Sequence, residues 1–269
     1  MKKISRRSFM AAAAVSVAAL ALTACGGSAS SAASSVASSA ASSEAASSAA
    51  AELTTVEAGK LTMATNATFP PYEMTTDSGE LEGIDVDTAK AIAEKLGLEL
   101  QIDDMDFDAA LLSVQQGKAD IVMAGVTVTD ERKAVMDFSD SYATGIQSII
   151  VPNDSDIASP DDLSGKKIGT QRGTTGYIYC SDDFGEDSVV AYDSGLTAVQ
   201  ALNNGQVDAV VIDNAPATEY VAANPGLKVL DTSYAEEDYA IGMAKGSALE
   251  ELKADGTLQA IVDKYINAN

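Results

Sequence analysis

Arg132 is the residue whose type and position most clearly indicate chemistry. It follows Thr129-Asp130-Glu131, which has the pattern of a capped, acidic helix start, and the partial positive charge at a helix N-terminus disfavours an arginine there. Arg172 is the only other arginine beyond residue 7. A guanidinium beside backbone N–H groups and the Thr127 hydroxyl suits a small carboxylate. A solvated arginine on a helix surface is the simpler alternative.

Three further segments carry groups that could bind a small charged molecule. Gly173-Thr-Thr-Gly176 precedes a helix pattern, and the free backbone N–H groups at a helix start form an anion site. Asp213 ends an apolar strand pattern, where it could either cap the next helix or pair with an ammonium group. Phe69, Tyr72 and Phe107 lie in loop contexts, which favours the wall of a pocket over core packing. A carboxylate receptor combined with an ammonium receptor indicates a zwitterionic ligand.

The segments that must position these residues alternate between strand and helix patterns. Strands are predicted at 61–65, 98–102, 119–124, 148–151, 167–169, 189–191, 208–212 and 227–230. Helices are predicted from a cap at Asp87 to a stop at Gly97, over 109–114, after Ser159-Pro160, and from near Gly195 and Asn214. This alternation predicts an α/β fold whose sheets are mostly parallel and flanked by helices.

An internal repeat indicates two similar lobes. Val114–Gly125 aligns without gaps on Leu202–Asp213, and each copy holds a helix end, a glycine, an aspartate and an apolar strand. Gly125 and Asp213 should therefore end equivalent strands. Ligands of open α/β sheets bind beyond the carboxyl ends of the strands, so a cleft between the lobes is expected. A chance similarity of two α/β units is the alternative.

Composition excludes several classes of partner. The chain has 17 basic and 40 acidic residues, and removing four basic leader residues leaves 13 against 40, a formal charge of −27. That charge argues against nucleic acid. There is no histidine, and beyond Cys25 there is one cysteine, Cys180, so we expect no metal, no cofactor and no intramolecular disulfide. The acidic groups at 85/87 and 103/104/106 lack calcium-loop spacing and are interpreted as solvated or capping carboxylates.

The first 55 residues look like export and anchoring segments. Residues 1–24 have a basic start and a short apolar core, as in a signal peptide. Ser5-Arg6-Arg7-Ser8-Phe9-Met10 resembles a twin-arginine signal, with the general secretory route as the alternative. Leu22-Thr-Ala-Cys25 resembles a lipobox, which implies a lipid on Cys25. Residues 25–55 are rich in Ser and Ala and predict a disordered tether that holds the protein outside a bacterial cell membrane.

Residues 57–269 resemble the family 3 extracellular solute-binding proteins, the polar amino-acid receptors of bacterial ABC importers. The resemblance rests on Ala67-Thr-Phe-Pro-Pro-Tyr-Glu73, Gly83-Ile-Asp-Val-Asp87, Met105-Asp-Phe107, Ala124–Arg132, Asp137-Phe-Ser-Asp140 and Gly173–Gly176. It implies a two-lobed, type II periplasmic-binding-protein-like fold. Lobe 1 would comprise 56–145 and 238–269, and lobe 2 would comprise 146–237, with the ligand cleft between them.

The resemblance also implies roles for individual residues. Arg132 and the backbone N–H groups of Thr127 and of the Thr174–Thr175 turn would hold the ligand α-carboxylate. Asp213, the Gly125 carbonyl and the Thr127 hydroxyl would hold the α-ammonium group. Phe69 and Phe107 would flank the side-chain stem, and Asn66 and Gln171 would contact its tip. Two neutral amides favour a neutral polar amino acid such as glutamine or cystine.

Partners and rival functions follow from the same resemblance. Expected partners are an amino acid, the permease subunits of an ABC transporter and the membrane through the lipid anchor, with the protein itself a monomer. A dehydratase-type enzyme of the same fold and a ligand-sensing module of a signalling receptor are the alternatives. The chain offers no histidine and no clear carboxylate pair for acid–base catalysis, so we expect no enzymatic activity. The segment 247–256 is shorter than the corresponding helix of family members, and we expect this difference to affect the stability of the fold more than ligand binding.

Overall fold

The computed structural model describes residues 54–247 together with 249, 253, 256 and 258–260. The expected signal peptide and Cys25 lie outside these residues, as do nearly all of the expected tether and most of the segment 247–256. Within the described part, no helix is long and apolar enough to cross a membrane.

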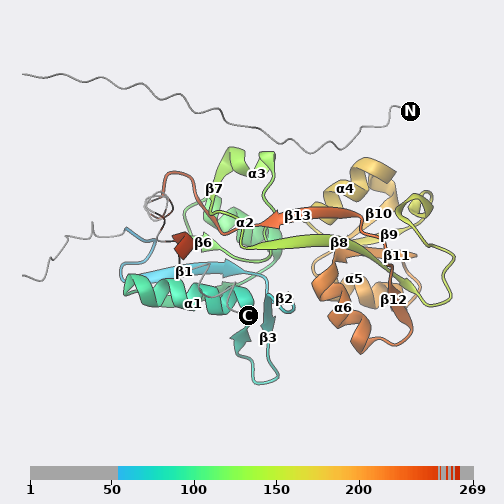
Figure 1. Cartoon of the computed structure of the whole chain (residues 1–269), viewed down its shortest axis with the longest axis horizontal. Coiled ribbons are helices and arrows are strands. Elements are labelled where there is room, and N and C mark those ends of the chain that lie inside the picture. The colour runs from blue at the N-terminus through green and yellow to red at the C-terminus, as the bar shows by residue number, and fades with distance from the viewer. Residues whose placement is uncertain (1–53, 248, 250–252, 254–255, 257, 261–269) are drawn as a thin grey trace, which may run out of the picture. The chain divides into compact units, whose positions relative to one another are not determined.

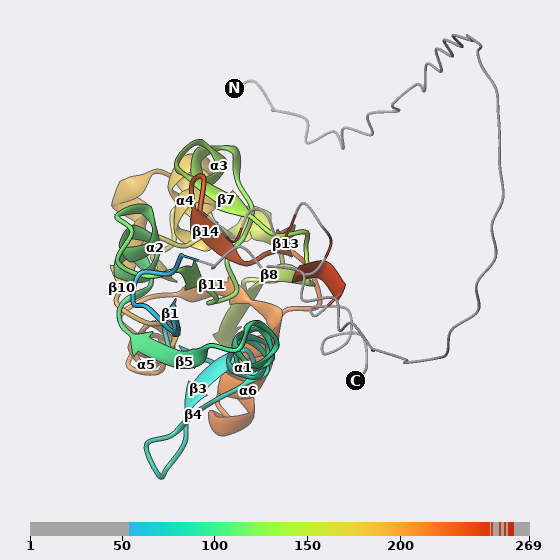
Figure 2. The same cartoon turned by 90° about the vertical axis from the view of Figure 1, so that its left-hand side faces the viewer.

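Among the residues with defined elements, the first lobe has a five-stranded sheet and the helices α1, α2 and α3. The strand order is β5-β1-β6-β14-β7. These strands are β1 (Lys60–Thr65), β5 (Glu99–Asp104), β6 (Ile121–Val122), β7 (Met136–Phe138) and β14 (Gly242–Ala244). The helices are α1 (Ile84–Leu96), α2 (Phe107–Gln115) and α3 (Asp130–Val135). A small sheet of β2 (Thr68–Phe69), β3 (Glu73–Thr75) and β4 (Leu81–Glu82) lies beside α1 (Figure 2).

The second lobe is a six-stranded sheet with its own helices. The strand order is β10-β9-β11-β8-β12, and β13 also pairs with β8. The strands are β8 (Ala143–Pro152), β9 (Ile168–Gln171), β10 (Val189–Tyr192), β11 (Ala209–Asp213), β12 (Leu227–Val229) and β13 (Ala235–Tyr239). The helices are α4 (Thr175–Phe184), α5 (Gly195–Asn203), α6 (Asn214–Ala223) and the 3-10 helices η1 (Pro160–Leu163) and η2 (Glu186–Ser188).

Both sheets are mixed, although the sequence predicts mostly parallel ones. Three strands are parallel in each lobe, β5-β1-β6 and β10-β9-β11, and the remaining pairings are antiparallel. The antiparallel strands occur where the chain passes between the lobes. β8 carries the chain away from the first lobe, and β13 runs back beside it (Figure 1), followed by β14 of the first sheet.

The two connections between the lobes run side by side. β8 and β13 are antiparallel, with partners from Ala143↔Tyr239 to Gln147↔Ala235. The two connecting strands are therefore hydrogen-bonded to each other in the stretch where the chain changes lobes. Two adjacent strands can twist together without breaking either sheet.

The internal repeat corresponds to the same local structure in both lobes. Gly117 and Gly205 follow α2 and α5 with φ of 65° and 66°. Asp120 and Asp208 each accept a hydrogen bond of 2.7 Å from a backbone N–H group near the start of the neighbouring parallel strand. The expected equivalence of Gly125 and Asp213 is less close, because Asp213 ends β11 whereas Gly125 lies three residues beyond the short β6.

Some element boundaries differ from the predicted ones. α1 begins at Ile84, so Asp87 lies in its first turn rather than at its cap. Gly83 is the residue before the helix, with φ of 131°, and a Cβ there would lie 2.2 Å from the Tyr72 carbonyl oxygen. Only glycine fits this position. The helix predicted after Ser159 is a single 3-10 turn, and the strand predicted over 119–124 pairs only at 121–122.

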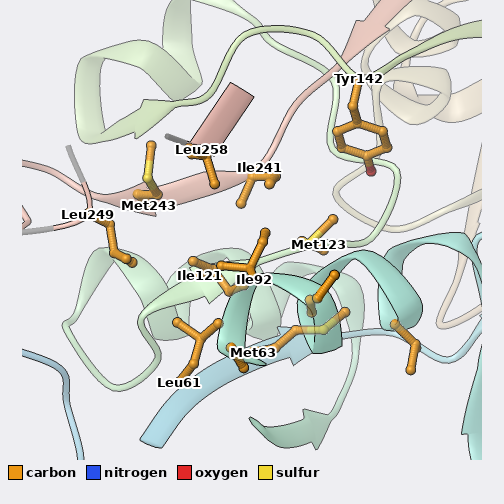
Figure 3. Close-up of a cluster of buried hydrophobic side chains, with 14 of the residues drawn as sticks. Leu61, Met63, Ile92, Ile121, Met123, Tyr142, Ile241, Met243, Leu249 and Leu258 are labelled. Carbon is orange, nitrogen blue, oxygen red and sulfur yellow. The ribbon is translucent and has the colours of Figure 1, made fainter. Parts of the chain in front are cut away.

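The core of the first lobe lies between α1 and its sheet. Ile92 of α1 packs with Leu61, Met63 and Ile121 of the strands, together with Met243 (Figure 3). Leu249 and Leu258 are also buried in this cluster. This apolar layer holds β1 and β6 in register, and both strands end at the pocket described below.

Two expectations about individual side chains are wrong. Tyr72 is not a pocket wall, because it belongs to the core of the first lobe, where its ring meets Tyr239 edge-on. Asp85 is neither solvated nor a cap: it is 0% exposed. Because α1 begins at Ile84, the Asp85 side chain is on the inner side of the first turn, where it accepts hydrogen bonds from Gly125 and Tyr142.

Candidate functional site

A pocket lies between residues of the two lobes. It is lined by all ten residues that the resemblance assigns to the ligand: Asn66, Phe69, Phe107, Gly125, Thr127, Arg132, Gln171, Thr174, Thr175 and Asp213. The first lobe contributes β2, the start of α2 and the segment from Gly125 to Arg132. The second lobe contributes the end of β9, the start of α4 and the end of β11.

Arg132 is a buried cation at the side of this pocket. The Thr129 side chain caps α3 by accepting a hydrogen bond from the Arg132 backbone N–H at 3.1 Å. The Arg132 side chain is 8% exposed, so it is not the solvated surface residue of the simpler alternative. Burial lowers its pKa from the ordinary arginine value, and the charge of Glu237 opposes that shift.

The guanidinium of Arg132 retains unused donors. It donates to the Thr127 carbonyl at 2.8 Å and to the Gly173 carbonyl at 3.1 Å, and it lies 5.4 Å from the centre of the Phe107 ring. Five N–H groups are available in a guanidinium, so three remain. No carboxylate of the described residues lies within 4.0 Å of it. A buried guanidinium without an anionic partner can bind a carboxylate in two-point geometry.

Asp213 is a buried carboxylate on the opposite lobe. It caps α6 by accepting from the Ala215 N–H at 2.9 Å, and its other oxygen accepts from the Ile146 N–H at 2.7 Å. Its side chain is 2% exposed, and burial raises its pKa above the ordinary aspartate value. Asp213 therefore caps a helix and also lines the pocket, while its pairing with an ammonium group stays a prediction. Each carboxylate oxygen keeps a further lone pair for a donor.

The helix start of α4 forms another wall of the pocket. Thr174 caps α4, accepting from the Tyr177 N–H at 3.3 Å, and Thr175 is the first helical residue. The Thr175 hydroxyl lies 3.5 Å from the Thr127 hydroxyl across the pocket. Gly173 has φ of 75°, which lets the loop approach Asp108 of the first lobe. α4 thus directs free backbone N–H groups to the same side as Arg132.

Asn66 and Gln171 are hydrogen-bonded to each other across the pocket. Gln171 Nε2 donates to Asn66 Oδ1 at 2.8 Å and to the Asp193 carbonyl at 3.3 Å. Asn66 Nδ2 donates to the Met105 carbonyl, and Asn66 Oδ1 also accepts from the Thr68 hydroxyl. Both N–H groups of Gln171 are therefore used, whereas its Oε1 is an acceptor that remains available.

Phe69 and Gly125 meet closely at the floor. Gly125 has φ of 54°, and a Cβ there would lie 2.8 Å from the Phe69 ring and 3.2 Å from Tyr239. Any larger residue would push Phe69 out of place. Arg172, by contrast, does not line the pocket; its exposed side chain forms an ion pair with Asp193 at 3.3 Å.

Sequence reasoning missed several residues of the site, above all Glu237. Its Oε2 accepts from the Thr127 hydroxyl at 3.1 Å and from Gln147 Nε2 at 3.0 Å. It stands in the run Glu236-Glu237-Asp238, which looks like a solvated surface. β13 alternates inward and outward, so Glu237 and Tyr239 are buried while Glu236 and Asp238 are exposed. Glu237 lies behind the pocket as a partner of its lining residues Thr127 and Gln147, whereas Glu73, Gln147 and Tyr239 line the pocket directly.

Known proteins resemble this chain over most of its length. The sequence model of the bacterial extracellular solute-binding proteins, family 3, matches residues 61–268. The L-cystine-binding protein TcyJ of Escherichia coli K12 is 32% identical over 225 residues, covering 79% of this chain and 85% of that protein. A probable histidine-binding protein of Neisseria gonorrhoeae is 34% identical over 271 residues, covering 94% of each chain.

Solved structures give the same result. The holo form of the arginine-binding protein ArgBP from T. maritima is 38% identical, with a TM-score of 0.69, over 78% of this chain and 90% of that one. Agreement in sequence, in fold and across most of both chains is sufficient to assign the family. The chain belongs to the bacterial extracellular solute-binding proteins, family 3, which are solute receptors and not enzymes.

Proposed function

We propose that this protein captures a free polar α-amino acid between its lobes and delivers it to the permease subunits of an ABC importer. The observation that carries the proposal is that two buried charged groups line the pocket from opposite lobes, Arg132 and Asp213, and that neither has a salt-bridge partner within 4.0 Å among the described residues. An α-amino acid brings one carboxylate and one ammonium group, and so satisfies both. Relatives named as cystine-, histidine- and arginine-binding proteins support the same class of ligand.

The side-chain end of the pocket favours a planar group that donates hydrogen bonds. Both donors of Gln171 are occupied, so its Oε1 is the free group there, and Phe69 and Phe107 supply flat apolar walls. A guanidinium or a primary amide fits such a site. We therefore propose arginine or glutamine as ligand. The structure of an ancestral arginine-binding protein with bound glutamine, 41% identical to this chain, supports treating the two together.

Closure of the lobes is the proposed mechanism. We place lobe 1 at 56–145 and 238–269 and lobe 2 at 146–237, with the hinge in the paired strands β8 and β13. Contacts between the lobes include those of Gln171 with Asn66 and of Arg132 with Gly173 at the pocket, and the bond from the Tyr220 hydroxyl to the Thr68 carbonyl. A ligand that touches both lobes binds the closed state better and shifts the hinge equilibrium towards it.

Anchoring by a lipid on Cys25 completes the proposal. It would hold a monomeric receptor at the outer face of the bacterial cell membrane, next to its permease. The Ser/Ala-rich composition of 25–55 supports a flexible tether. The high negative charge of the mature protein supports solubility at such an exposed location.

A ligand screen on the purified full chain tests this function. Each of the twenty amino acids and cystine is added, and the melting temperature is recorded. A ligand at about 100 times its dissociation constant adds roughly 2.7 kcal/mol of stability, or a rise of about 5–10 °C for a domain of this size. Small-angle scattering should show compaction with the same ligand. If no amino acid changes either the melting temperature or the radius of gyration, the proposed function is wrong.

A further inference from the structure

Glu73 and Asp85 form a carboxyl pair at the floor of the pocket. Glu73 is the first residue of β3, Asp85 lies in the first turn of α1, and both are 0% exposed. Glu73 lines the pocket, and the Asp85 backbone N–H donates at 2.9 Å to the carbonyl of Tyr72, the residue before Glu73, so the two buried carboxyl groups are neighbours. Neither group belongs to the charges that the proposed function uses.

No cationic group of the described residues acts on the pair. Both oxygens of Glu73 and Oδ1 of Asp85 have no N–H or hydroxyl donor among the described residues. The other titratable groups that face Glu73 are Asp104 and the tyrosines 72, 142 and 220, which are acids themselves. Two adjacent carboxylates without a cation cannot both be ionised in a buried site, so at least one of the two groups must be protonated.

Asp85 is the member that carries the charge. Its Oδ2 accepts from the Gly125 N–H at 3.1 Å and from the Tyr142 hydroxyl at 2.9 Å, whereas Glu73 has no such donors. Hydrogen bonds to a carboxylate favour its ionised form. Accordingly, burial raises the pKa of Asp85 to about 6, and burial together with Asp85 raises the pKa of Glu73 well above its ordinary value. At neutral pH the pair holds one proton and one negative charge.

The charged member is connected to the binding site. Asp85 accepts a hydrogen bond from the backbone N–H of Gly125, which lines the pocket. The carbonyl of the same residue is an expected acceptor for the ligand ammonium group. Tyr142 immediately precedes β8, the strand that crosses to the second lobe. Asp85 therefore fixes the ammonium end of the pocket and contacts the start of the hinge.

We propose that Glu73 and Asp85 act as a proton-sharing positioning pair, in which protonated Glu73 keeps Asp85 ionised beneath the ammonium site and acid switches that charge off. The coupling to the ligand rests on the proposed function, whereas the shared proton does not. Below about pH 6 Asp85 takes up a proton from solvent, the pair becomes neutral and ammonium binding weakens.

The shared proton is tested first, without ligand. Difference infrared spectroscopy of the full chain at pH 7.5 should show the carbonyl band of a protonated carboxylic acid. The band should persist in Asp85→Asn, because burial still opposes ionisation of Glu73, and it should be missing in Glu73→Gln. Absence of the band in the wild type, or its persistence in Glu73→Gln, would overturn the shared-proton assignment.

Coupling to the pocket is tested by calorimetry with L-arginine and L-glutamine. Both variants replace a carboxyl group with an amide of the same shape, so a purely structural role predicts similar losses. We expect Asp85→Asn to bind at least tenfold more weakly than wild type at pH 7.5, and Glu73→Gln, which leaves the Asp85 charge in place, to lose clearly less affinity than Asp85→Asn. The ratio of the Asp85→Asn and wild-type dissociation constants should fall towards one at pH 5, where Asp85 is protonated in the wild type. Asp87→Asn, which replaces an exposed acid on the same helix as Asp85, should keep the wild-type profile.

The outcomes separate the two proposals. Equal losses in the two variants, or a ratio that does not change with pH, would overturn the coupling. If neither arginine nor glutamine binds, the amino acid found in the thermal screen replaces them. If no amino acid binds, the proposed function and the coupling are both wrong. The infrared band still tests whether Glu73 is protonated, because that measurement needs no ligand.

Discussion

Replacing Arg132 with alanine removes the proposed carboxylate receptor. In the wild type the guanidinium is 8% exposed and two of its N–H groups hold the Thr127 and Gly173 carbonyls. The remaining three can meet a ligand carboxylate. Without them, a carboxylate enclosed by the lobes loses its charged partner, which costs about 2–5 kcal/mol. The dissociation constant should rise by about 30-fold to several thousand-fold.

The assay is calorimetric titration of the full chain with the amino acid found in the thermal screen. Arg132→Lys keeps the charge but lacks the planar fork, so it should lose less affinity than Arg132→Ala but still bind more weakly than wild type. Arg172→Ala is the matched control, since its side chain is exposed and its ion pair with Asp193 contributes about 0–1 kcal/mol. Binding by Arg132→Ala within threefold of wild type would refute the assignment of the carboxylate site.

Further predictions concern the opposite charge, the effect of pH and the anchor. Asp213→Asn keeps the cap of α6 but removes the charge, and calorimetry should show a loss of affinity similar to that of Arg132→Ala; unchanged affinity would mean that Asp213 is a cap alone. Burial raises the pKa values of Glu73, Asp85 and Asp213, so the folded state binds more protons than the unfolded state. The contribution of these groups to the free energy of unfolding therefore falls as the pH rises from about 4 through 6. Calorimetric unfolding of the empty protein should therefore give a higher melting temperature at pH 5 than at pH 7.5, with a smaller difference in Glu73→Gln, and an equal difference in both proteins would contradict this. Cys25→Ala should release the protein from the membrane fraction or leave it unprocessed, whereas equal retention would exclude the lipid anchor. Export should be blocked by the double replacement Arg6→Lys and Arg7→Lys if the twin-arginine route is used.

The parts of the site that were predictable from the sequence depend on neighbours close in the chain. Arg132 could be singled out because it departs from the local pattern of an acidic helix start, and its cap and one carbonyl partner lie three and five residues away. The start of α4 and the two glycines of the repeat are likewise local features. Such patterns can be interpreted from the sequence because the residues that interact lie within a single turn or strand.

The parts that were missed depend on contacts between distant segments. Asp85 looked solvated, but its partners Gly125 and Tyr142 are 40 and 57 residues away. Glu237 looked like part of an acidic surface run, yet it meets Thr127 across 110 residues. Charged residues are seldom buried, so burial of an isolated carboxylate is not expected unless its partners are known. The mixed sheets were missed for the same reason, since the direction of β8 and β13 is set by where the chain changes lobes.

The central claim is that the pocket recognises both charges of an α-amino acid. The most direct measurement is calorimetric titration of the full chain with the preferred amino acid and with its decarboxylated and deaminated analogues, which for arginine are agmatine and 5-guanidinopentanoate. Each analogue leaves one of Arg132 and Asp213 without a partner in a closed pocket. Both should therefore bind at least 30-fold more weakly than the amino acid. An analogue that binds as tightly as the amino acid would contradict the account.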